Sequence, residues 1–410
     1  METNNQKNDK NIIPNDADKQ QKGVNVPNLR FKEFNGNYKA CKINEIANVV
    51  GGGTPDTLNE KFWNGGINWF TPTEIGHKKY VTISNRTIST DGLNNSSAKI
   101  LPVGSILFSS RATVGESSIN LIETTTNQGF QSLVINNENS NEYIYYLIQT
   151  LKKHFIKQAC GSTFPEISNS EVSKTKICIP KIQEQYKIAK FFSLLDQRID
   201  TQNKIIEDLE LFKKGIENQY FGYHKSNEYV ILGDIITQVN NRNEQNKDFE
   251  VLSVSNKYGF IPQSEQFDDH EVASANKSNY KIVKQNDFAY NPARINVGSI
   301  AMLRNNQVGI VSPMYICFRV DNNRILSSYL NYFSHSNKFN NEVLKNLEGS
   351  VRLCLSFESL SKIKINIPSL DTQYEIVKNL DLISDKISVE NEILEKLKEQ
   401  KKYLLSNMFI

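Results

Sequence analysis

The sequence predicts an α/β (α+β) protein in which two globular domains are joined and spaced by two long helices, all built from an internal repeat. Three observations lead to this fold class. The chain repeats itself, the back of each copy carries an apolar heptad pattern, and the front of each copy mixes short β-rich runs with polar, glycine-bearing turns. The 410 residues, 38% of them hydrophobic, suffice for two or three ordinary domains.

The repeat is clearest at the back of each copy. The stretch Lys176-Ile-Cys-Ile-Pro180 recurs 188 positions later as Lys364-Ile-Asn-Ile-Pro368. Further forward the copies agree only in outline, as where Arg111-Ala-Thr-Val-Gly115 corresponds to Arg294-Ile-Asn-Val-Gly298. A duplicated scaffold that carries two divergent front parts is suited to presenting two different surfaces.

The heptad pattern after each proline predicts two long helices, Gln185–Phe221 and Gln373–Phe409. Each would be about 55 Å long at a rise of 1.5 Å per residue. Because neither amphipathic helix is stable alone in water, the two bury their apolar seams most simply by pairing. Seam residues of this kind hold helices together, so any binding role is expected on the exposed faces. The predicted seam consists of Ile199, Ile206, Leu209 and Ile216 with Ile387, Leu394, Leu397 and Leu404.

The front parts, residues 24–180 and 223–368, are predicted to be two compact α/β domains of ordinary size. A helix is expected near Tyr143–Gln158 in the first and near Tyr329–Leu347 in the second. The helical segments then occupy residues 181–222 and 369–410, and the polar residues 1–23 are predicted to form a disordered tail. Short β-rich runs are expected at Val103–Ser109, Leu133–Asn136 and Val308–Val320.

Composition excludes several classes of protein. No apolar run approaches the length of a membrane helix and no signal peptide is visible, so a cytoplasmic protein is expected. The five cysteines are not arranged as a C-x-x-C clip, and we expect reduced, mostly buried thiols and no metal site. A net charge of +3 does not by itself indicate a nucleic-acid partner.

Taken in order, these features resemble the specificity subunits of Type I restriction-modification systems. The resemblance rests on two variable front parts, each followed by a helix that begins Pro180-x-x-x-Glu184-Gln185 or Pro368-x-x-x-x-Gln373. The opening Val26-Pro-Asn-Leu-Arg-Phe-Lys-Glu-Phe34 and Gly161-Ser162-Thr163 are similar to family features as well, so the resemblance covers residues 24–410. One departure is Thr372, which stands where the first copy has Glu184, and we expect it to weaken one partner contact.

The resemblance implies a DNA-reading role. Each front part would be a target recognition domain that binds one half of a bipartite site in double-stranded DNA. The helices would form an antiparallel coiled coil that sets the spacing and docks two methyltransferase subunits, which restriction and translocase subunits join. This chain would not be an enzyme and would hold no cofactor, because S-adenosylmethionine, ATP and magnesium would belong to the partner subunits.

Candidate DNA-binding residues lie at matched places in the two copies. Basic residues beside an aromatic ring suit a DNA backbone, although a solvated loop is an equally good interpretation. Arg111 and Arg294 could grip a phosphate or guanine, or could pair with a carboxylate of the fold, and their equivalence favours phosphate or scaffold over base reading. The full set of candidates is Lys78, Lys79, Tyr80, Arg111, Thr163, Lys257, Tyr258, Arg294 and Arg352.

Two other functions remain open. A pure assembly scaffold would share the coiled coil but would not explain two divergent front domains. A stand-alone adenine methyltransferase would need a catalytic motif, and Asn291-Pro292-Ala293-Arg294 lacks the second proline and the aromatic residue of that motif. The run Gly51-Gly52-Gly53 is interpreted as a flexible turn, because no Gly-Lys-Ser/Thr follows it.

Overall fold

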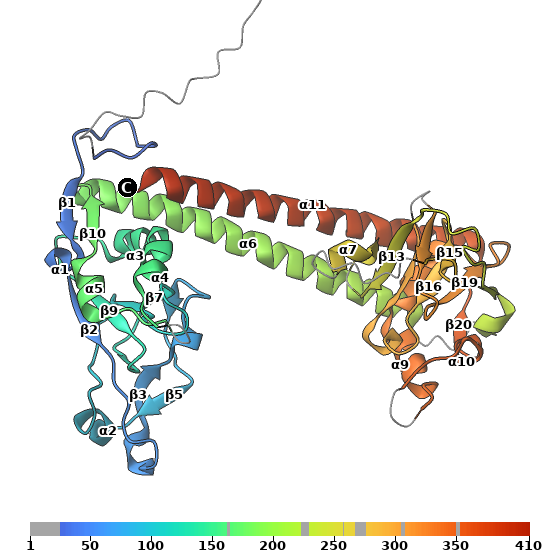
Figure 1. Cartoon of the computed structure of the whole chain (residues 1–410), viewed down its shortest axis with the longest axis horizontal. Helices are drawn as coiled ribbons and strands as arrows, with labels where there is room; N and C mark the ends of the chain where they lie inside the picture. Colours follow the sequence, from blue (N-terminus) through green and yellow to red (C-terminus); the bar gives the residue numbers. More distant parts are fainter. Residues whose placement is uncertain are drawn as a thin grey trace, which may run out of the picture. The chain divides into compact units, whose positions relative to one another are not determined.

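A computed structural model describes residues 25–161, 165–222, 229–256, 258–266, 276–304, 308–349 and 353–410. The chain divides into two compact units, the first formed by Met1–Thr201 with Glu395–Ile410 and the second by Gln202–Leu394. Each unit therefore contains one globular domain together with parts of both long helices (Figure 1). This division differs from the linear boundaries predicted from sequence, and the predicted tail 1–23 lies outside the described residues.

The globular part of the first unit is built on three small sheets. The largest has the order β2-β9-β6-β7-β4, a second has the order β5-β3-β8, and β1 pairs with β10 alone. Their bounds are β1 Lys39–Lys42, β2 Ala47–Gly51, β3 Trp63–Phe70, β4 Tyr80–Val81, β5 Arg86–Ile88, β6 Ile106–Phe108, β7 Ser117–Asn120, β8 Thr125–Thr126, β9 Gln131–Ile135 and β10 Lys176–Ile179.

Five short helices complete this domain. Helix α3 is the most buried of them, because all six of its residues from Tyr143 to Ile148 are packed in the core with Phe108 and Phe192. Ser140 caps its first turn by accepting a hydrogen bond from the amide of Tyr143. The helix expected at Tyr143–Gln158 is thus two helices. The bounds are α1 Ile43–Ile46, α2 Thr90–Asn94, α3 Asn141–Thr150, α4 Lys152–Gln158 and α5 Asn169–Lys174.

The second unit repeats this plan. Its strands are β11 Tyr229–Ile231, β12 Ile236–Val239, β13 Glu250–Ser255, β14 Gly259–Pro262, β15 Lys281–Val283, β16 Phe288–Tyr290, β17 Ile300–Met302, β18 Gly309–Val311, β19 Ile316–Val320 and β20 Lys364–Asn366. Its short helices are α7 Gln263–Gln266, α8 Ser327–Ser334, α9 Asn337–Lys345 and α10 Phe357–Ser361. The single helix expected at Tyr329–Leu347 is again a pair, α8 and α9.

Strand order shows the duplication more strongly than the sequence does. The sheet β12-β19-β16-β17 has the same order and the same antiparallel pairings as β2-β9-β6-β7. The parallel pair β3·β8 corresponds to the parallel pair β13·β18, and β1·β10 corresponds to β11·β20. The two front parts, which agree in sequence only in outline, therefore share one fold.

Two long helices run from these domains, α6 over Ile182–Phe221 and α11 over Leu370–Met408. Both begin two residues after a proline, three residues earlier than predicted, so Gln185 and Gln373 lie inside the first turn. In the first unit Phe192 of α6 contacts Phe409, just beyond the end of α11, and Asp196 contacts Lys401. In the second unit Gln202 contacts Glu390, and Tyr220 contacts Asn379. Partner numbers fall as α6 advances, so the helices are antiparallel within each unit.

The predicted seam residues are all at least partly buried. Ile206, Leu394 and Leu397 are buried, and the other five are half-buried. One polar pair interrupts the apolar seam of the second unit, where the Gln202 side-chain amide donates to the Glu390 backbone oxygen at 2.9 Å. These two residues are 188 positions apart, so they occupy equivalent positions of the repeat.

Two expectations about small residues need correction. The cysteines are free but not mostly buried: Cys41 and Cys317 are buried, whereas Cys160 is exposed. The glycine run is a close-packed segment and not a flexible turn. A Cβ on Gly52 would lie 1.9 Å from the Asn127 carbonyl oxygen, so only glycine fits there. Within the described residues, no helix is both long enough and apolar enough to span a bilayer.

Candidate nucleic-acid interface

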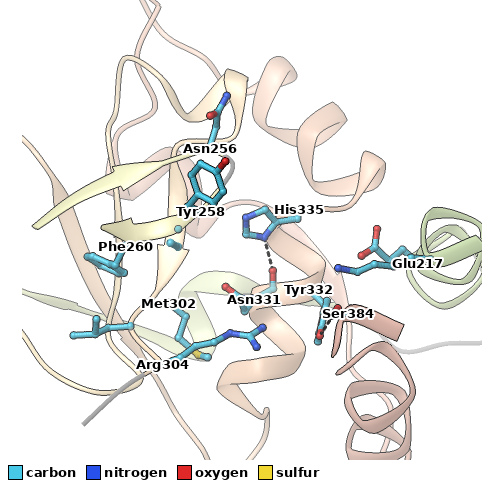
Figure 2. A pocket seen from close by; sticks show the side chains of 14 residues that line it. Glu217, Asn256, Tyr258, Phe260, Met302, Arg304, Asn331, Tyr332, His335 and Ser384 are labelled. Carbon is cyan, nitrogen blue, oxygen red and sulfur yellow. Dashed lines mark hydrogen bonds between the residues drawn. The ribbon is translucent and has the colours of Figure 1, made fainter. Parts of the chain in front are cut away.

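Each unit contains a cleft bounded on one side by the globular domain and on the other by the long helices. The cleft of the first unit has a volume of about 1400 Å³ and lies between the segment Gly76–Tyr80, helices α3 and α4, and the facing sides of α6 and α11. The cleft of the second unit is smaller, about 460 Å³. Figure 2 shows the latter, which is lined by Asn256, Tyr258 and Phe260 of the globular domain and by Glu217 and Ser384 of the long helices.

A network of ionic and aromatic side chains forms the wall of the first cleft. The Tyr146 hydroxyl donates to Asp196 at 2.6 Å, and Lys401 pairs with the same carboxylate at 2.6 Å. Lys79 pairs with Glu142 at 3.0 Å, and the Tyr80 hydroxyl donates to Glu142 at 2.6 Å. Burial disfavours the Glu142 carboxylate, but the hydrogen bonds from Tyr80 and Lys79 outweigh it and lower its pKa.

The second cleft has a related but different wall. The Tyr332 hydroxyl donates to Asp381 at 2.5 Å, and Arg304 lies 3.6 Å from the same carboxylate. His335 accompanies them, with its Nδ1 2.8 Å from the Asn331 carbonyl oxygen (Figure 2). Burial lowers the pKa of His335, and the nearby charges of Lys213 and Arg304 lower it further. Both effects favour the neutral imidazole over the protonated one.

Several residues predicted from sequence to bind DNA lie in these clefts. Lys78 is exposed and lines the first cleft, and Tyr258 is 68% exposed and lines the second. Lys79 and Tyr80 also line the first cleft, but their polar groups are engaged with Glu142, which favours a structural role. Tyr80 moreover begins strand β4 and is not in a loop as predicted.

The paired arginines lie in equivalent loops, after β6 and after β16. Arg111 is 4.0 Å from Glu166 and half-buried, which agrees with the alternative of an arginine paired to a carboxylate of the fold. Arg294 is exposed at the start of a short 3-10 turn, Ile295–Val297. The candidates Thr163, Lys257 and Arg352 lie outside the described residues.

The structure also brings together residues that sequence analysis missed. Lys152 and Lys153 begin helix α4, and Lys398 and Lys402 lie on α11, yet all four line the first cleft. The sequence could have indicated Lys152 and Lys153 as cleft residues, because the two lysines are adjacent. It could not have indicated the α11 lysines, because a heptad pattern assigns them to a solvated face of the helix and does not show which face lies against the globular domain.

The glutamines of the proline–glutamine motif fasten each long helix to its domain. The Gln185 side chain accepts from the Ser140 amide at 2.9 Å and donates to the Pro180 carbonyl at 3.0 Å. Gln373 repeats this with the Leu326 amide at 2.8 Å and the Pro368 carbonyl at 2.8 Å. Both side chains are buried, and each joins the start of its long helix to the N-cap residue of α3 or of α8.

The difference between Glu184 in the first copy and Thr372 in the second is explained by contacts within the chain. Glu184, which is 2% exposed, accepts two hydrogen bonds from Arg30 and one from the Tyr38 hydroxyl. Arg30 belongs to the opening segment that precedes only the first copy, and its hydrogen bond to Glu184 raises its pKa. The Glu184 carboxylate is therefore engaged by residues of this chain, Arg30 and Tyr38. The geometry gives no support to the expectation that Thr372 weakens a contact with a partner subunit.

The remaining motif, Asn291-Pro292-Ala293-Arg294, lies in a turn after strand β16. The Asn291 side chain accepts a hydrogen bond from the Ala293 amide at 3.1 Å, as in an ordinary Asx turn. Across the described ranges, no group of three or more His, Cys, Asp or Glu residues is arranged to hold a metal ion.

Comparison with known proteins gives the family. The model of the Type I restriction modification DNA specificity domain matches twice, over residues 35–211 and 225–399. The MjaIX specificity subunit of Methanocaldococcus jannaschii is 36% identical over 218 residues, which are 48% of this chain and 50% of that protein. The EcoR124I/EcoR124II specificity subunit of Escherichia coli is 29% identical over 188 residues, 44% of this chain and 45% of that one. The chain thus spans about half the length of these curated relatives.

Solved structures give the same fold. The S subunit of a Type I restriction-modification system from M. genitalium matches with a TM-score of 0.56 and 17% identity, covering 94% of this chain and 99% of that one. A chain from a study of the assembly and conformational transition of the type I R-M system matches with a TM-score of 0.62 and 15% identity, covering 90% and 96%. Because the family model covers most of the sequence, once in each repeat, the chain belongs to the family of Type I restriction modification DNA specificity domains.

Proposed function

We propose that this chain is the DNA sequence-specificity subunit of a Type I restriction-modification complex, in which each globular domain binds one half of a bipartite target. The observation that carries the proposal is the double match of the family model, which falls on two domains that share the four-strand order β2-β9-β6-β7 and β12-β19-β16-β17. Each domain presents a cleft beside the long helices, and the cleft of the first unit is lined by seven lysines and three carboxylates. A positive cleft of this kind suits a phosphate backbone.

The paired helices set the spacing of the half-sites and dock two methyltransferase subunits. The exposed faces of the helices support this docking, because apolar residues recur on them at equivalent positions. Tyr186 and Tyr374 are 58% and 61% exposed, and Leu194 and Leu382 are 55% and 61% exposed. Two equivalent apolar surfaces suit two copies of one partner.

The chain contributes recognition and no chemistry of its own. S-adenosylmethionine, ATP and magnesium belong to the methyltransferase and the restriction or translocase subunits of the complex. Purified alone with S-adenosylmethionine or magnesium, the chain is expected to leave DNA unchanged. Robust methylation or cleavage by the isolated chain would contradict this part of the proposal.

The test of the whole proposal is methylation in a living cell. The chain is co-expressed with its cognate methyltransferase subunit in a host free of adenine methylation, and N6-methyladenine is mapped across the genome. The expected result is a split motif, two short defined halves around an unspecified gap. A soluble complex with an active methyltransferase and no methylated motif would contradict a specificity role and favour the assembly scaffold.

A domain exchange tests the modular part of the proposal. Residues 24–180 are replaced by the corresponding domain of another family member, and the methylated motif is mapped again. Only one half of the motif should change. A change in both halves, or in neither, would show that the two domains do not read the half-sites separately.

A further inference from the structure

The long helices present the same positions to both clefts but with different charges. In the first unit α11 contributes Lys398, Lys401, Lys402 and Leu405 to the cleft. The residues 188 positions earlier on α6 are Glu210, Lys213, Lys214 and Glu217, which line the cleft of the second unit and the hollow that adjoins it. The counterpart of Lys398 is thus a glutamate of the adjoining hollow, and the counterpart of Leu405 is a glutamate of the second cleft.

The rest of each cleft increases this contrast. Within the described residues, the first cleft adds Lys78 and Lys153, which are exposed, and Lys152, which pairs with Glu116. No carboxylate in the described part of the chain forms an ion pair with Lys78, Lys153 or Lys402. These three amines are available to an anion.

The second cleft is close to neutral. Among the described residues, Lys213 and Arg304 line this cleft together with Glu217, and Lys214 and Glu210 line the adjoining hollow. Arg304 is partly engaged with Asp381. The other side of this cleft is polar and aromatic, with Asn256, Tyr258 and Phe260 in Figure 2. Such a surface offers hydrogen bonds and stacking in place of charge.

We propose that the two clefts contact DNA unequally, with the first gripping the sugar-phosphate backbone through lysines of α4 and of α11. This inference rests on the proposed DNA-reading function and refines it. The C-terminal helix, which the sequence assigns to the second copy, then belongs to the DNA-binding surface of the first domain. Lys402 contacts phosphates there, and so does Lys398, whose ion pair with Glu395 at 2.8 Å is exposed and can be exchanged for a phosphate. The second cleft contributes little to the electrostatic part of binding.

The size of the effect follows from counterion release. Each phosphate contact contributes about −0.9 to the slope of log K against log salt concentration. Losing one contact therefore reduces the slope by about 1 and leaves specificity unchanged. Lysines of the first cleft are expected to produce this change when they are neutralised, whereas Lys213 and Lys214 are expected to produce much less.

The test exchanges charges between equivalent positions of the two clefts. Lys398→Glu gives the first cleft the residue of the second, and Glu210→Lys does the reverse; Lys402→Gln removes a single charge. Lys396→Glu and Glu207→Lys are matched controls, because both residues are exposed on the same helices and line neither cleft. The complex with the methyltransferase subunits is assembled for each variant, and its affinity for the mapped target duplex is measured across a salt series.

The expected result is a slope reduced by about 1 for Lys402→Gln and by at least that much for Lys398→Glu. For Glu210→Lys we expect tighter binding at low salt and a steeper slope. The controls should match the wild type. Equal slopes in all variants, or equal changes in the controls, would overturn the inference.

Two further outcomes separate this inference from the proposed function. If Lys398→Glu prevents assembly, which light scattering of the complex detects, the helix face contacts a subunit and not DNA, and the inference is wrong. If the wild-type complex binds the target duplex no more tightly than a scrambled duplex, the proposed function itself fails. Specific binding with unaltered slopes rejects the inference alone.

Discussion

The starts of the two long helices share one set of hydrogen bonds and differ in one ion pair. At the start of α6 and of α11, a buried glutamine joins the helix to its domain through the same backbone groups. Only α6 adds a buried ion pair, between Glu184 and Arg30. At the equivalent place α11 has Thr372, which is exposed. The glutamine brace therefore belongs to the repeated fold, whereas the ion pair belongs to a segment that the chain carries once.

The opening segment explains why the first unit needs this addition. The Leu29 amide donates to the Asn407 carbonyl at 2.8 Å, and Phe31 packs edge-on against Phe191. The segment thus lies against both the start of α6 and the end of α11, and Arg30 anchors it to Glu184. The two units therefore differ in the contacts that Leu29, Arg30 and Phe31 add to the first.

Removing the anchor should have the largest effect on this comparison. Arg30→Ala leaves the Glu184 carboxylate buried without its guanidinium, which costs about 3 kcal/mol or more. Thr372→Ala, at the equivalent place, should cost within about 0.5 kcal/mol because the side chain is exposed. Urea unfolding of the full chain gives both values, and amide hydrogen exchange shows whether the loss lies in the first unit.

A second substitution tests the explanation. Adding Glu184→Thr to Arg30→Ala removes the unpaired buried charge and copies the second unit, so much of the lost stability should return. If Arg30→Ala and Thr372→Ala cost the same, or if Glu184→Thr brings no recovery, the anchor does not distinguish the two units.

The glutamine braces should behave alike in the two units, with an intermediate effect. Gln185→Ala leaves the Ser140 amide and the Pro180 carbonyl without their partner, and Gln373→Ala leaves the Leu326 amide and the Pro368 carbonyl. Unsatisfied buried groups of this kind cost about 1–3 kcal/mol, so we expect about 2 kcal/mol for each variant. Urea unfolding of each variant checks this. A large loss for one glutamine and none for the other would mean that the brace is not a property of the shared fold.

Much of the fold was predictable because its signals are periodic. The heptad pattern located both long helices, and the 188-residue repeat predicted two domains of one kind. Helix starts were displaced by three residues, because the brace of Gln185 and Gln373 depends on backbone groups of a preceding loop that a periodic pattern does not contain. The glycine run was misinterpreted for the same reason: the constraint on Gly52 comes from Asn127, far along the chain.

The clefts were less predictable than the fold. The sequence singled out Lys78 and Tyr258, which line the clefts, because basic and aromatic residues follow strands at matched places. It did not single out Lys398 and Lys402, because only a tertiary contact shows which face of α11 lies against the first domain. Lys79 stays a predicted DNA contact, and the sequence could not show that Glu142 lies beside it.

The smallest difference between the units should appear in their response to pH. His335 lies three residues after Tyr332 in the second unit, and Gln149 lies three residues after Tyr146 in the first. Burial, with Lys213 and Arg304 nearby, holds the pKa of His335 below its ordinary value of 6.5, although backbone carbonyls of Asn331 and Ile300 oppose this. In the unfolded chain the imidazole takes up a proton at a higher pH than in the folded one.

Because the pKa of His335 is lower in the folded chain than in the unfolded chain, its protonation lowers the free energy of unfolding. The second unit has its full stability above pH 6.5 and loses part of it as the pH falls toward the lower pKa of the folded state. His335→Gln, which installs the residue of the first unit, should remove this loss. Glu217 in the same cleft has a raised pKa because it is buried. Its contribution to stability changes in the range near and above pH 4.5, and it increases as the pH falls, which is the opposite sign.

Hydrogen exchange of α8 is measured between pH 7.5 and 5.5 in the wild type and in the variant. The difference between the two proteins isolates the histidine, since ~2 pH units span its titration. Equal pH dependence in both proteins would show that His335 is not the titrating group, and the two units would then differ in charge but not in their response to protons.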